Sequence, residues 1–365
     1  MKIVHVIFTL LTGGVETMLL DIINEQSKTD EIHLLIINRE NDLTLLKSLK
    51  RPIGIHFVNK KLGGKSPFRL VKLNYLIYKI NPDVIHCHNE SMAKYILLKR
   101  NAKIVLTVHD VFFPIENCYR FSLPIKEYKR YSFPVKNYKR YDKIFAISKA
   151  VSDDIIKSGN RCEIIINGVD FESIQIKENP FYSDGTLKIV VISRLLHSKK
   201  GQDTVLEAMR YLREEKGVAN IYLDMIGDGS SREFLKGMTE NYSLTANVRF
   251  LGNKTRGYIY SHLKDYDLLI QPSRYEGFGL TVAEGMSACI PVLISDEKGP
   301  LEVIDGGKYG FVFEKEDYKG CAEKILYIKD NIDNFLPMLK EARERVKSHY
   351  SIKTTARSYI ERYSE

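Results

Sequence analysis

The feature that most constrains this chain is a repeated alternation of short apolar runs with longer amphipathic stretches. In the first half the apolar runs have the length of buried strands, and they fall at Ile3–Phe8, Ile32–Ile37, Ile55–Val58, Val84–His86, Ile104–Val108 and Ile144–Ile147. Stretches with helical spacing lie between them, at Glu16–Glu25, Pro67–Ile80 and Ala93–Leu98. Strands that alternate with helices form parallel sheets. The pattern predicts an α/β fold that begins with a doubly wound domain.

The second half repeats the alternation after a polar stretch that contains Pro180 and Gly185. Strands are expected near 187–192, 220–226, 248–250, 267–271, 290–294 and 310–313, with helices that start near Gln202, Ser231, Leu280 and Asp317. A chain of 365 residues is long enough for two domains. We therefore predict a Rossmann-like domain at 1–170, a linker at 171–186 and a second Rossmann-like domain at 187–350. The final stretch, 351–365, reads as an amphipathic helix that fits either domain and is able to cross back to the first.

Two doubly wound domains in one chain have a predictable ligand site. Ligands of such sheets bind outside the carboxyl ends of the strands. We expect the two sheets to face each other across a cleft that holds the site.

The cysteines and the distribution of apolar residues indicate in which cellular compartment the protein resides. Five cysteines, Cys87, Cys118, Cys162, Cys289 and Cys321, are odd in number and form no C-x-x-C pair. This pattern favours neither a disulfide framework nor a zinc site. The first thirty residues lack a leader-type apolar stretch, and no run of about 18 apolar residues occurs. We expect a cytoplasmic protein.

The positive charge of the chain is concentrated in its first half. The total is +9, and residues 1–170 hold 27 Lys and Arg against 17 Asp and Glu, which leaves +10 there and −1 in the remainder. Such asymmetry suggests an anionic partner for the first domain: nucleic acid, an anionic membrane surface or a phosphorylated acceptor. A solvated basic face without a partner is the alternative.

A tandem repeat of ten residues occupies 122–141. Its two copies, 122–131 and 132–141, each set Lys, Lys and Arg among Tyr and either Phe or Leu. Cations at lipid phosphates with aromatic rings at headgroup depth would give peripheral contact with an anionic membrane, which would place the protein at the inner face of the cell membrane. A solvated hairpin or helix that shapes acceptor entry is the alternative interpretation.

Glycines and cations follow two of the predicted strands. Gly13 and Gly14 stand between the first strand and a helix, where a ligand phosphate can approach the backbone, although an ordinary turn explains them as well. The full G-x-G-x-x-G fingerprint is absent, which disfavours a dehydrogenase. Arg194 lies two residues after a strand and is followed by Lys199 and Lys200. Cations at this edge suit a diphosphate, and a solvated loop is the alternative.

The most specific motif spans 272–284. Glu276 precedes a glycine-bearing turn, and Glu284 lies within the helix that follows, so seven residues separate two carboxylates. The turn exposes backbone N–H groups at a helix N-terminus, where a phosphate can lie between the two carboxylates. One carboxylate would then reach a sugar and the other a ribose.

With these motifs in order, the chain resembles glycosyltransferase family 4, the retaining, nucleotide-sugar-dependent enzymes of GT-B fold, along nearly its whole length. The segments that carry the resemblance are 13–16, 83–88, 107–110, 146–148, 167–170, 193–195 with the lysine pair, 227–229, 250–252 and the E-x7-E motif at 276–284.

The resemblance implies roles for individual residues. Glu276 would hold hydroxyls of the donor sugar and Glu284 the ribose. Arg194 and a lysine would hold the diphosphate, and His109 would lie near the transferred sugar. The remaining donor contacts would come from Gly13, Gly14 and the backbone of Gly277, Phe278, Gly279 and Leu280. Glu276, His109, Arg194 and Lys200 form the expected catalytic set.

Three departures from the family pattern are visible. One extra residue follows Arg194, so Lys199 and Lys200 both remain candidates, and we favour Lys200. Cys289 replaces a glycine, and Lys298 with Gly299 stands where the family has two glycines. These changes bear on loop geometry.

We expect neither a metal nor another cofactor. His86 and His88 alternate at a strand end without further ligands, which favours polar packing. Asp265 and Asp267 form a D-x-D triplet, but it precedes a strand instead of following one. Glu276 and Glu284 are not taken as a glycosidase pair, because that pair must flank one scissile bond.

The resemblance implies a hexosyltransferase that moves a hexose from a nucleoside-diphosphate sugar to a glycan or lipid-linked glycan. A role in bacterial cell-surface polysaccharide or lipopolysaccharide biosynthesis would follow. The rivals are a nucleotide-sugar epimerase, a phosphorylase of the same fold, and a basic nucleic-acid-binding protein. The E-x7-E motif with Arg194 and Lys200 argues against all three, so we expect no nucleic-acid partner.

Overall fold

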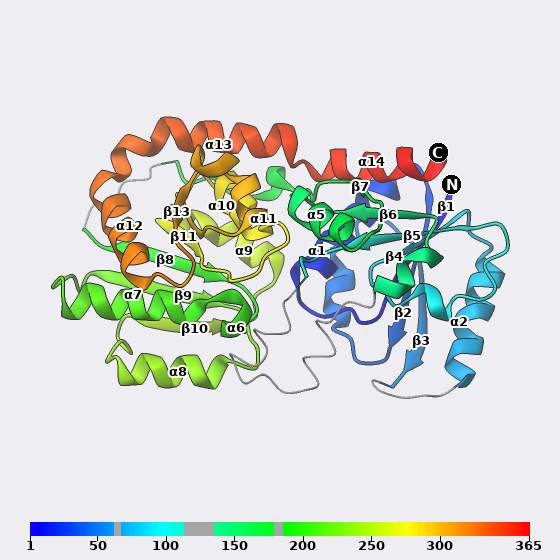
Figure 1. Ribbon diagram of the computed structural model, residues 1–365, viewed down its shortest axis with the longest axis horizontal. Coiled ribbons are helices and arrows are strands. Elements are labelled where there is room, and N and C mark those ends of the chain that lie inside the picture. Colours follow the sequence, from blue (N-terminus) through cyan, green and yellow to red (C-terminus); the bar gives the residue numbers. More distant parts are fainter. Residues whose placement is uncertain (62–66, 113–134, 179–184) are drawn as a thin grey trace. The chain divides into compact units, whose positions relative to one another are not determined.

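The chain folds into two compact units (Figure 1). The computed structural model describes residues 1–61, 67–112, 135–178 and 185–365. Unit 1 contains Met1–Gly168 together with Ile352–Glu365, and unit 2 contains Val169–Ser351. Each unit is built on a parallel sheet with helices connecting the strands. The predicted α/β class with two doubly wound, Rossmann-like units is confirmed.

The sheet of unit 1 has the strand order β3-β2-β1-β4-β5-β6-β7 in the described residues. Its strands are β1 Lys2–Ile7, β2 Glu31–Asn38, β3 Gly54–Lys60, β4 Val84–Cys87, β5 Lys103–Val108, β6 Lys143–Ala146 and β7 Glu163–Ile164. The central strands are buried almost throughout. Continuous apolar runs are typical of parallel strands covered on both faces.

The helices of unit 1 come from both ends of the chain. They are α1 Gly14–Gln26, α2 Pro67–Ile80, α5 Lys149–Lys157 and α14 Ile352–Ser364, with 3-10 turns η1 Leu43–Ser48, η2 Ala93–Tyr95 and η3 Val135–Arg140. The helix predicted at Ala93–Leu98 is wrong, since only η2 forms there. The Asn74 side-chain oxygen accepts the N–H groups of Leu97 and Leu98 at 2.6 and 3.0 Å. These bonds hold the backbone out of the helical path.

The sheet of unit 2 has the order β10-β9-β8-β11-β12-β13. Its strands are β8 Leu187–Ile192, β9 Ile221–Ile226, β10 Val248–Gly252, β11 Leu268–Gln271, β12 Val292–Ser295 and β13 Phe311–Phe313. The helices are α6 His197–Lys200, α7 Gln202–Glu214, α8 Arg232–Asn241, α9 Arg256–His262, α10 Leu280–Ser287, α11 Lys298–Val303, α12 Tyr318–Asn331 and α13 Leu336–His349. The 3-10 turns are η4 Phe171–Ser173, η5 Leu263–Asp265, η6 Asp305–Gly307 and η7 Ile332–Phe335. Every predicted strand of either unit is present, with ends within two residues of the prediction.

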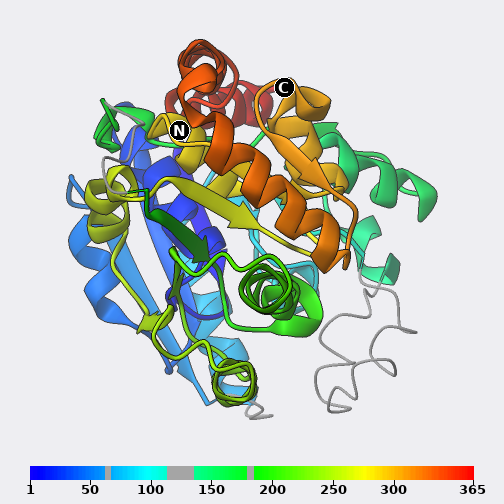
Figure 2. The ribbon, with the colours of Figure 1, turned by 90° about the vertical axis from the view of Figure 1, so that its left-hand side faces the viewer.

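The core of unit 2 lies between the sheet and a layer of helices. Helices α7 and α12 pack side by side on one face of the sheet (Figure 2). Apolar side chains of α7, such as Leu206 and Leu212, are buried with Cys321 and Ile325 of α12 and with strand residues such as Leu223. This packing fixes the strands whose carboxyl ends carry the predicted motifs.

The chain passes between the units at two adjacent points. It leaves unit 1 after Gly168 and returns at Ile352. The Val169 N–H donates to the Tyr350 carbonyl at 2.7 Å, and a Cβ on Gly168 would lie 2.6 Å from Ile352 Cα. Glycine is therefore required where the two crossings touch. The described part of the predicted linker 171–186 belongs to unit 2.

The C-terminal helix α14 packs on unit 1, against α1. Its Tyr359 and Tyr363 are fully buried there. In the described part of the chain no helix combines the length and apolar character that a bilayer span requires.

Most of the tandem repeat, 122–134, lies outside the described residues. Of its second copy, Tyr138 and Tyr141 are buried, whereas Lys139 and Arg140 are exposed. The Tyr141 hydroxyl accepts the Ala93 N–H at 3.1 Å and lies 2.9 Å from the Glu90 carbonyl oxygen, to which it donates. These two rings are part of the core of unit 1 and do not reach a lipid surface.

Candidate active site

The predicted anion-binding residues of unit 2 gather where the strand order reverses. The chain runs from β8 outward to β10, then returns to β11 on the other side of β8. A doubly wound sheet opens a crevice at such a switch point, outside the carboxyl ends of the two strands. Arg194 and Lys200 follow β8, and Glu276 follows β11. The fold thus brings together motifs that lie about 80 residues apart in sequence.

An ion pair joins the two loops. Lys200 Nζ lies 2.6 Å from Glu276 Oε2, and Gln271 Nε2 donates to the same oxygen at 2.8 Å. Both groups are mostly but not completely buried, with side-chain exposures of 20% and 17%. Because both bonds end on Oε2, Oε1 is left to accept further hydrogen bonds.

Close backbone approach explains why the loops meet there. Gly201 has φ +64°, and a Cβ on it would lie 1.9 Å from the Pro272 carbonyl oxygen. Only glycine fits this junction. The Arg274 and Tyr275 N–H groups donate to the Lys199 carbonyl at 2.8 and 3.2 Å. The loop after β11 is therefore fixed on the backbone that carries Lys200.

Arg274 strengthens this attachment and was not recognised as a site residue from sequence. Its guanidinium is buried and makes a bidentate pair with Asp203 at 2.7 and 2.9 Å. Its Nε donates to Glu316 at 2.5 Å. A bidentate, buried pair is rigid, so Arg274 positions the Glu276 loop without being free to bind a ligand. No local sequence signal separates it from a ligand-binding arginine.

The turn before α10 places backbone donors beside Glu276. Gly279 takes φ +99° as the N-cap of α10, and a Cβ there would lie 3.2 Å from Gln271 Oε1. Phe278 is buried and packs edge-on against Tyr350 at 5.5 Å between ring centroids, so only its backbone faces the turn. First-turn amides of a helix lack acceptors within the helix. The turn from Gly277 to Leu280 therefore leads into the positively polarised N-terminus of α10.

The remaining predicted residues of unit 2 differ in accessibility. Glu284 is buried within α10, with Oε1 3.6 Å from Arg256 Nη2. Arg194 is exposed. Lys199 is buried and its carbonyl anchors the next loop, whereas Lys200 contacts Glu276. The geometry favours Lys200 over Lys199 as the lysine available to a ligand.

The D-x-D triplet has a structural role at its second acid. Asp267 is buried, accepts the Lys188 N–H at 2.8 Å and pairs with Lys177 at 2.5 Å. Its carboxylate therefore fixes the entry of β11, at the opposite end of the strand from Glu276.

Unit 1 has its own switch point between β1 and β4. Gly13 and Gly14 follow β1, and a Cβ on Gly14 would meet nothing within 4 Å. Gly13 has φ −173°, which any residue adopts. The space beside the Gly14 backbone is therefore open. Neither its backbone conformation nor its packing requires a glycine at this position.

His109 follows β5 and ends a buried chain of hydrogen bonds. Gln26 Oε1 lies 2.8 Å from His5 Nε2, His5 Nδ1 lies 3.1 Å from His88 Nε2, and His88 Nδ1 lies 3.1 Å from His109 Nε2. An amide oxygen only accepts, so His5 carries its proton on Nε2 and accepts at Nδ1. His88 must then donate to His5 from Nε2, which leaves His88 Nδ1 as an acceptor. His109 in turn donates to His88 from its own Nε2. His109 Nδ1 is left as an acceptor without a partner among the described residues.

Burial keeps these rings neutral. It lowers the pKa of His5 and of His109 to about 4, and it holds the pKa values of His86 and His88 well below their usual range. Each of these hydrogen-bonded rings must be neutral, because only a neutral imidazole has one donor nitrogen and one acceptor nitrogen.

The three rings His5, His86 and His88 have nitrogens within 4.8 Å of one another, a spacing that also suits a metal ion. However, His86 bonds Thr107 at 2.7 Å through Nε2 and Tyr363 at 2.6 Å through Nδ1. With the bonds of His5 and His88, all six nitrogens have protein partners. These hydrogen bonds explain the three rings as buried polar packing, and the bond from His86 to Tyr363 attaches α14 to the sheet of unit 1.

One further carboxyl was missed from sequence. Glu90 follows β4, and its pKa is raised to about 7, mainly by burial and also by the nearby Asp110. An acid so close to neutrality at a carboxyl edge is a candidate for proton exchange. Tyr359 and Tyr363, also missed, have a weak signal in their i,i+4 spacing on an amphipathic helix.

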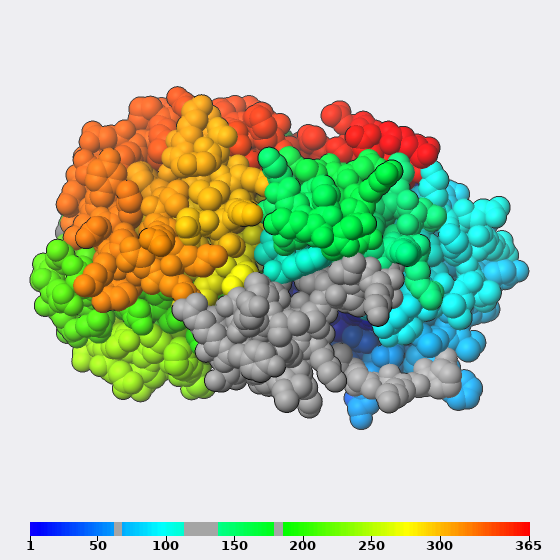
Figure 3. Space-filling view, viewed as in Figure 1, coloured from blue at the N-terminus to red at the C-terminus, as the bar shows by residue number. Residues whose placement is uncertain are grey.

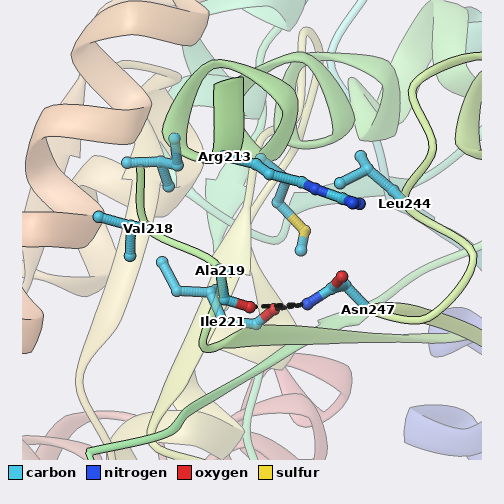
Figure 4. Close-up of a pocket in the computed structure, with 8 residues that line it drawn as sticks. Arg213, Val218, Ala219, Ile221, Leu244 and Asn247 are labelled. Atoms are coloured by element: carbon cyan, nitrogen blue, oxygen red, sulfur yellow. Dashed lines mark hydrogen bonds between the residues drawn. The ribbon is translucent and has the colours of Figure 1, made fainter. Parts of the chain in front are cut away.

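A small pocket elsewhere in unit 2 is not a functional site. It lies between α7 and the amino end of β9, with about 210 Å³ of empty space including open solvent (Figure 4). Asn247 there donates to the carbonyls of Ala219 and Ile221 at 2.9 Å each. The enclosed cavity has a volume of only about 10 Å³, barely enough for one water molecule. It also lies at the amino end of the strand, whereas ligands of such sheets bind outside the carboxyl ends.

Two Rossmann-like units, each on a parallel sheet with a switch point, are the architecture of GT-B glycosyltransferases. Residues 12–173 match the family described as Glycosyltransferase Family 4, and residues 173–348 match Glycosyl transferases group 1. The chain belongs to these glycosyltransferase families, which together account for nearly its whole length.

Curated relatives are similar over part of their length. The putative colanic acid biosynthesis glycosyltransferase WcaL of Escherichia coli is 27% identical over 199 residues, covering 52% of this chain and 48% of the relative. The poly(ribitol-phosphate) alpha-N-acetylglucosaminyltransferase of Staphylococcus aureus is 26% identical over 204 residues, covering 54% and 40%. The matched region thus spans half the length of these relatives or less.

The fold of the whole chain also matches solved structures. Anabaena Alr3699/HepE, solved in complex with UDP and glucose, has a TM-score of 0.82 at 19% identity and covers 100% of both chains. This similarity confirms the GT-B fold.

Proposed function

We propose that this protein transfers a hexose from a nucleoside-diphosphate sugar to a hydroxyl of a glycan or lipid-linked glycan, with retention of the anomeric configuration. The observation that carries the proposal is the Lys200–Glu276 pair, 2.6 Å apart at the switch point and directly before α10. A cation, a carboxylate and helix-end N–H groups are what a diphosphate joined to a sugar requires.

Each part has a separate task in the transfer. Breaking the bond from sugar to phosphate leaves negative charge on the diphosphate, which Arg194, Lys200 and the first turn of α10 stabilise electrostatically. Glu276 Oε1 accepts sugar hydroxyls while Lys200 and Gln271 fix Oε2. Glu284 binds the ribose.

The acceptor hydroxyl loses its proton in the same event. The departing phosphate oxygen takes that proton, so the sugar–phosphate bond breaks, the new glycosidic bond forms and no dedicated base is needed. The unprotonated Nδ1 of His109 accepts a hydroxyl of the transferred sugar. We propose that no metal takes part, because protein cations meet the diphosphate.

The relatives support a surface-polysaccharide role. WcaL is named for colanic acid biosynthesis, and the staphylococcal relative is named for transfer of N-acetylglucosamine to poly(ribitol phosphate). We infer a bacterial cell-surface polysaccharide, such as lipopolysaccharide, as the product class, made at the cytoplasmic side of the membrane.

The repeat at 122–141 supplies a second part of the proposal. Its six cations, Lys126, Lys129, Arg130, Lys136, Lys139 and Arg140, would contact an anionic membrane where a lipid-linked acceptor resides. Replacing all six by Gln should then weaken liposome binding while donor hydrolysis persists.

The activity is tested by incubating the protein with a panel of nucleotide sugars and measuring thermal shift and release of nucleoside diphosphate. We expect one nucleotide sugar to stabilise the protein and to be hydrolysed slowly, with loss of hydrolysis in Glu276→Gln. Absence of both effects over the whole panel, together with steeply salt-dependent oligonucleotide binding, would instead favour the nucleic-acid-binding rival.

A further inference from the structure

The solvent side of α2 is apolar where a sheet-covering helix is normally polar. Phe68, Val71, Tyr75 and Tyr78 are 81%, 66%, 57% and 48% exposed. At about 100° per residue they fall within an arc of about 80°. The opposite side of α2, which includes Leu73 and Ile77, is buried on the sheet. The exposed rings therefore have no role in the core of unit 1.

Two neighbouring leucines extend this surface. Leu97 and Leu98 are 70% and 52% exposed, and both are tied to α2 by hydrogen bonds to Asn74. The Arg100 guanidinium lies 4.0 Å from the centre of the Tyr78 ring. We call these six apolar residues the α2 face, that is Phe68, Val71, Tyr75, Tyr78, Leu97 and Leu98. The space-filling view shows the light blue to cyan surface of this region open to solvent (Figure 3). An exposed apolar patch with a polar rim marks an interaction site.

The surroundings of the α2 face are positive. Residues 67–110 contain seven Lys and Arg against three Asp and Glu, a net charge of +4. Of these cations Lys79, Lys94 and Arg100 are exposed. Two such faces from two copies would bring their cations together, which disfavours self-association through a two-fold interface.

We propose that the α2 face docks on an anionic lipid bilayer. Phe and Leu side chains enter the acyl boundary, the tyrosine rings lie at headgroup depth, and Lys79, Lys94 and Arg100 meet lipid phosphates. This surface lies in described residues distinct from the repeat. The proposal does not depend on the transferase activity, because neither α2 nor the leucines belong to the candidate active site.

The test is cosedimentation of the full chain with vesicles of phosphatidylcholine alone or with about 30% phosphatidylglycerol at physiological salt. The variant Phe68→Ser/Tyr75→Ser/Leu97→Ser should lower the partition coefficient on anionic vesicles roughly tenfold or more. A matched control, Tyr222→Ser/Phe234→Ser/Tyr327→Ser, removes three rings of unit 2 that are 45%, 50% and 50% exposed. The control should bind as the unaltered protein does.

A charge variant separates the two contributions. Lys79→Gln/Lys94→Gln/Arg100→Gln should weaken binding and make it less salt-dependent, while donor hydrolysis and thermal unfolding stay unchanged. Unchanged sedimentation of the folded Ser variant would overturn the proposal, and so would an equal loss in the control. Conversion of a dimer to a monomer by the Ser variant, measured by light scattering without vesicles, would assign the face to a second copy instead. Loss of all binding on neutralising the repeat, with the Ser variant unaffected, would assign membrane contact to the repeat alone.

Discussion

Acid should unfold unit 1 at a higher pH than unit 2, because unit 1 buries His5, His86, His88 and His109 as neutral rings. Burial lowers the pKa of His5 and of His109 to about 4 from 6.5. Between these values the unfolded chain binds more protons than the native one. Stability is therefore complete above pH 6.5 and is lost as the pH falls toward about 4.

The size of the effect follows from these two rings. At about pH 5 a histidine with pKa 6.5 in the unfolded chain is almost fully protonated, whereas a native one with pKa about 4 is mostly neutral. This difference lowers the free energy of unfolding by about 2 kcal/mol per ring. His5 and His109 together remove about 4 kcal/mol, and His86 and His88 act in the same direction. Since domains are stable by about 5–15 kcal/mol, this is a large fraction of the total.

Urea unfolding at several pH values, read by peptide-resolved hydrogen exchange, separates the units. Peptides from β1 and β4 should lose protection in acid before those from β8 and β9. His5→Gln keeps a hydrogen-bonding side chain that cannot titrate, so the slope of stability against pH should fall by about one proton, or about 1.4 kcal/mol per pH unit. The exposed His349→Gln serves as control. Equal acid sensitivity of the two units, or an unchanged slope in His5→Gln, would refute the reasoning.

Four further predictions concern the two switch points. Glu276→Gln and Arg194→Ala should each lower turnover more than about tenfold with normal folding, and near-normal rates with the proper acceptor would remove both from the site. EDTA should leave the rate largely intact, and loss restored by Mn²⁺ or Mg²⁺ would show that a metal is needed. Gly201→Ala should cost about 2 kcal/mol or more in urea unfolding, because its φ is +64° and Pro272 leaves no room for a Cβ, whereas a neutral effect would contradict the tight junction. Glu90→Gln should stabilise the protein at about pH 8 but not at about pH 4, because the pKa of the carboxyl rises from 4.5 to about 7 and its ionised form is the costly one; a gain independent of pH would exclude that explanation.

The strand-turn-helix unit that carries the candidate site residues of unit 2 could be predicted from sequence. Glu276, the glycine turn and Glu284 fall within one strand-turn-helix unit, whose geometry depends on local rules. Strand positions were also predictable, because buried parallel strands are continuous apolar runs. The pairing of Lys200 with Glu276 required the sheet order, which only the fold supplies.

Long-range partners could not be predicted. Tyr363 bonds His86 across 277 residues, and Arg274 bonds Asp203 across 71. Periodicity identified α14 as amphipathic but not which unit buries it, because either sheet offers an apolar surface. The roles of Gln26 and His5 follow only from the hydrogen-bond chain that ends at His109.

The adjacent crossings at Gly168–Val169 and Ser351–Ile352 mean that the second unit is an insertion within the first. A gene fragment that stops before Ile352 encodes an incomplete first unit, with His86 deprived of the Tyr363 hydroxyl. Exchange of the second unit between relatives accordingly needs two recombination points, one on each side. Only then does α14 remain in the same protein as the histidines that it contacts. A single crossover would combine Tyr359 and Tyr363 of one protein with the unit 1 core of another. To produce the first unit alone, α14 can be joined ahead of β1 in a circular permutant.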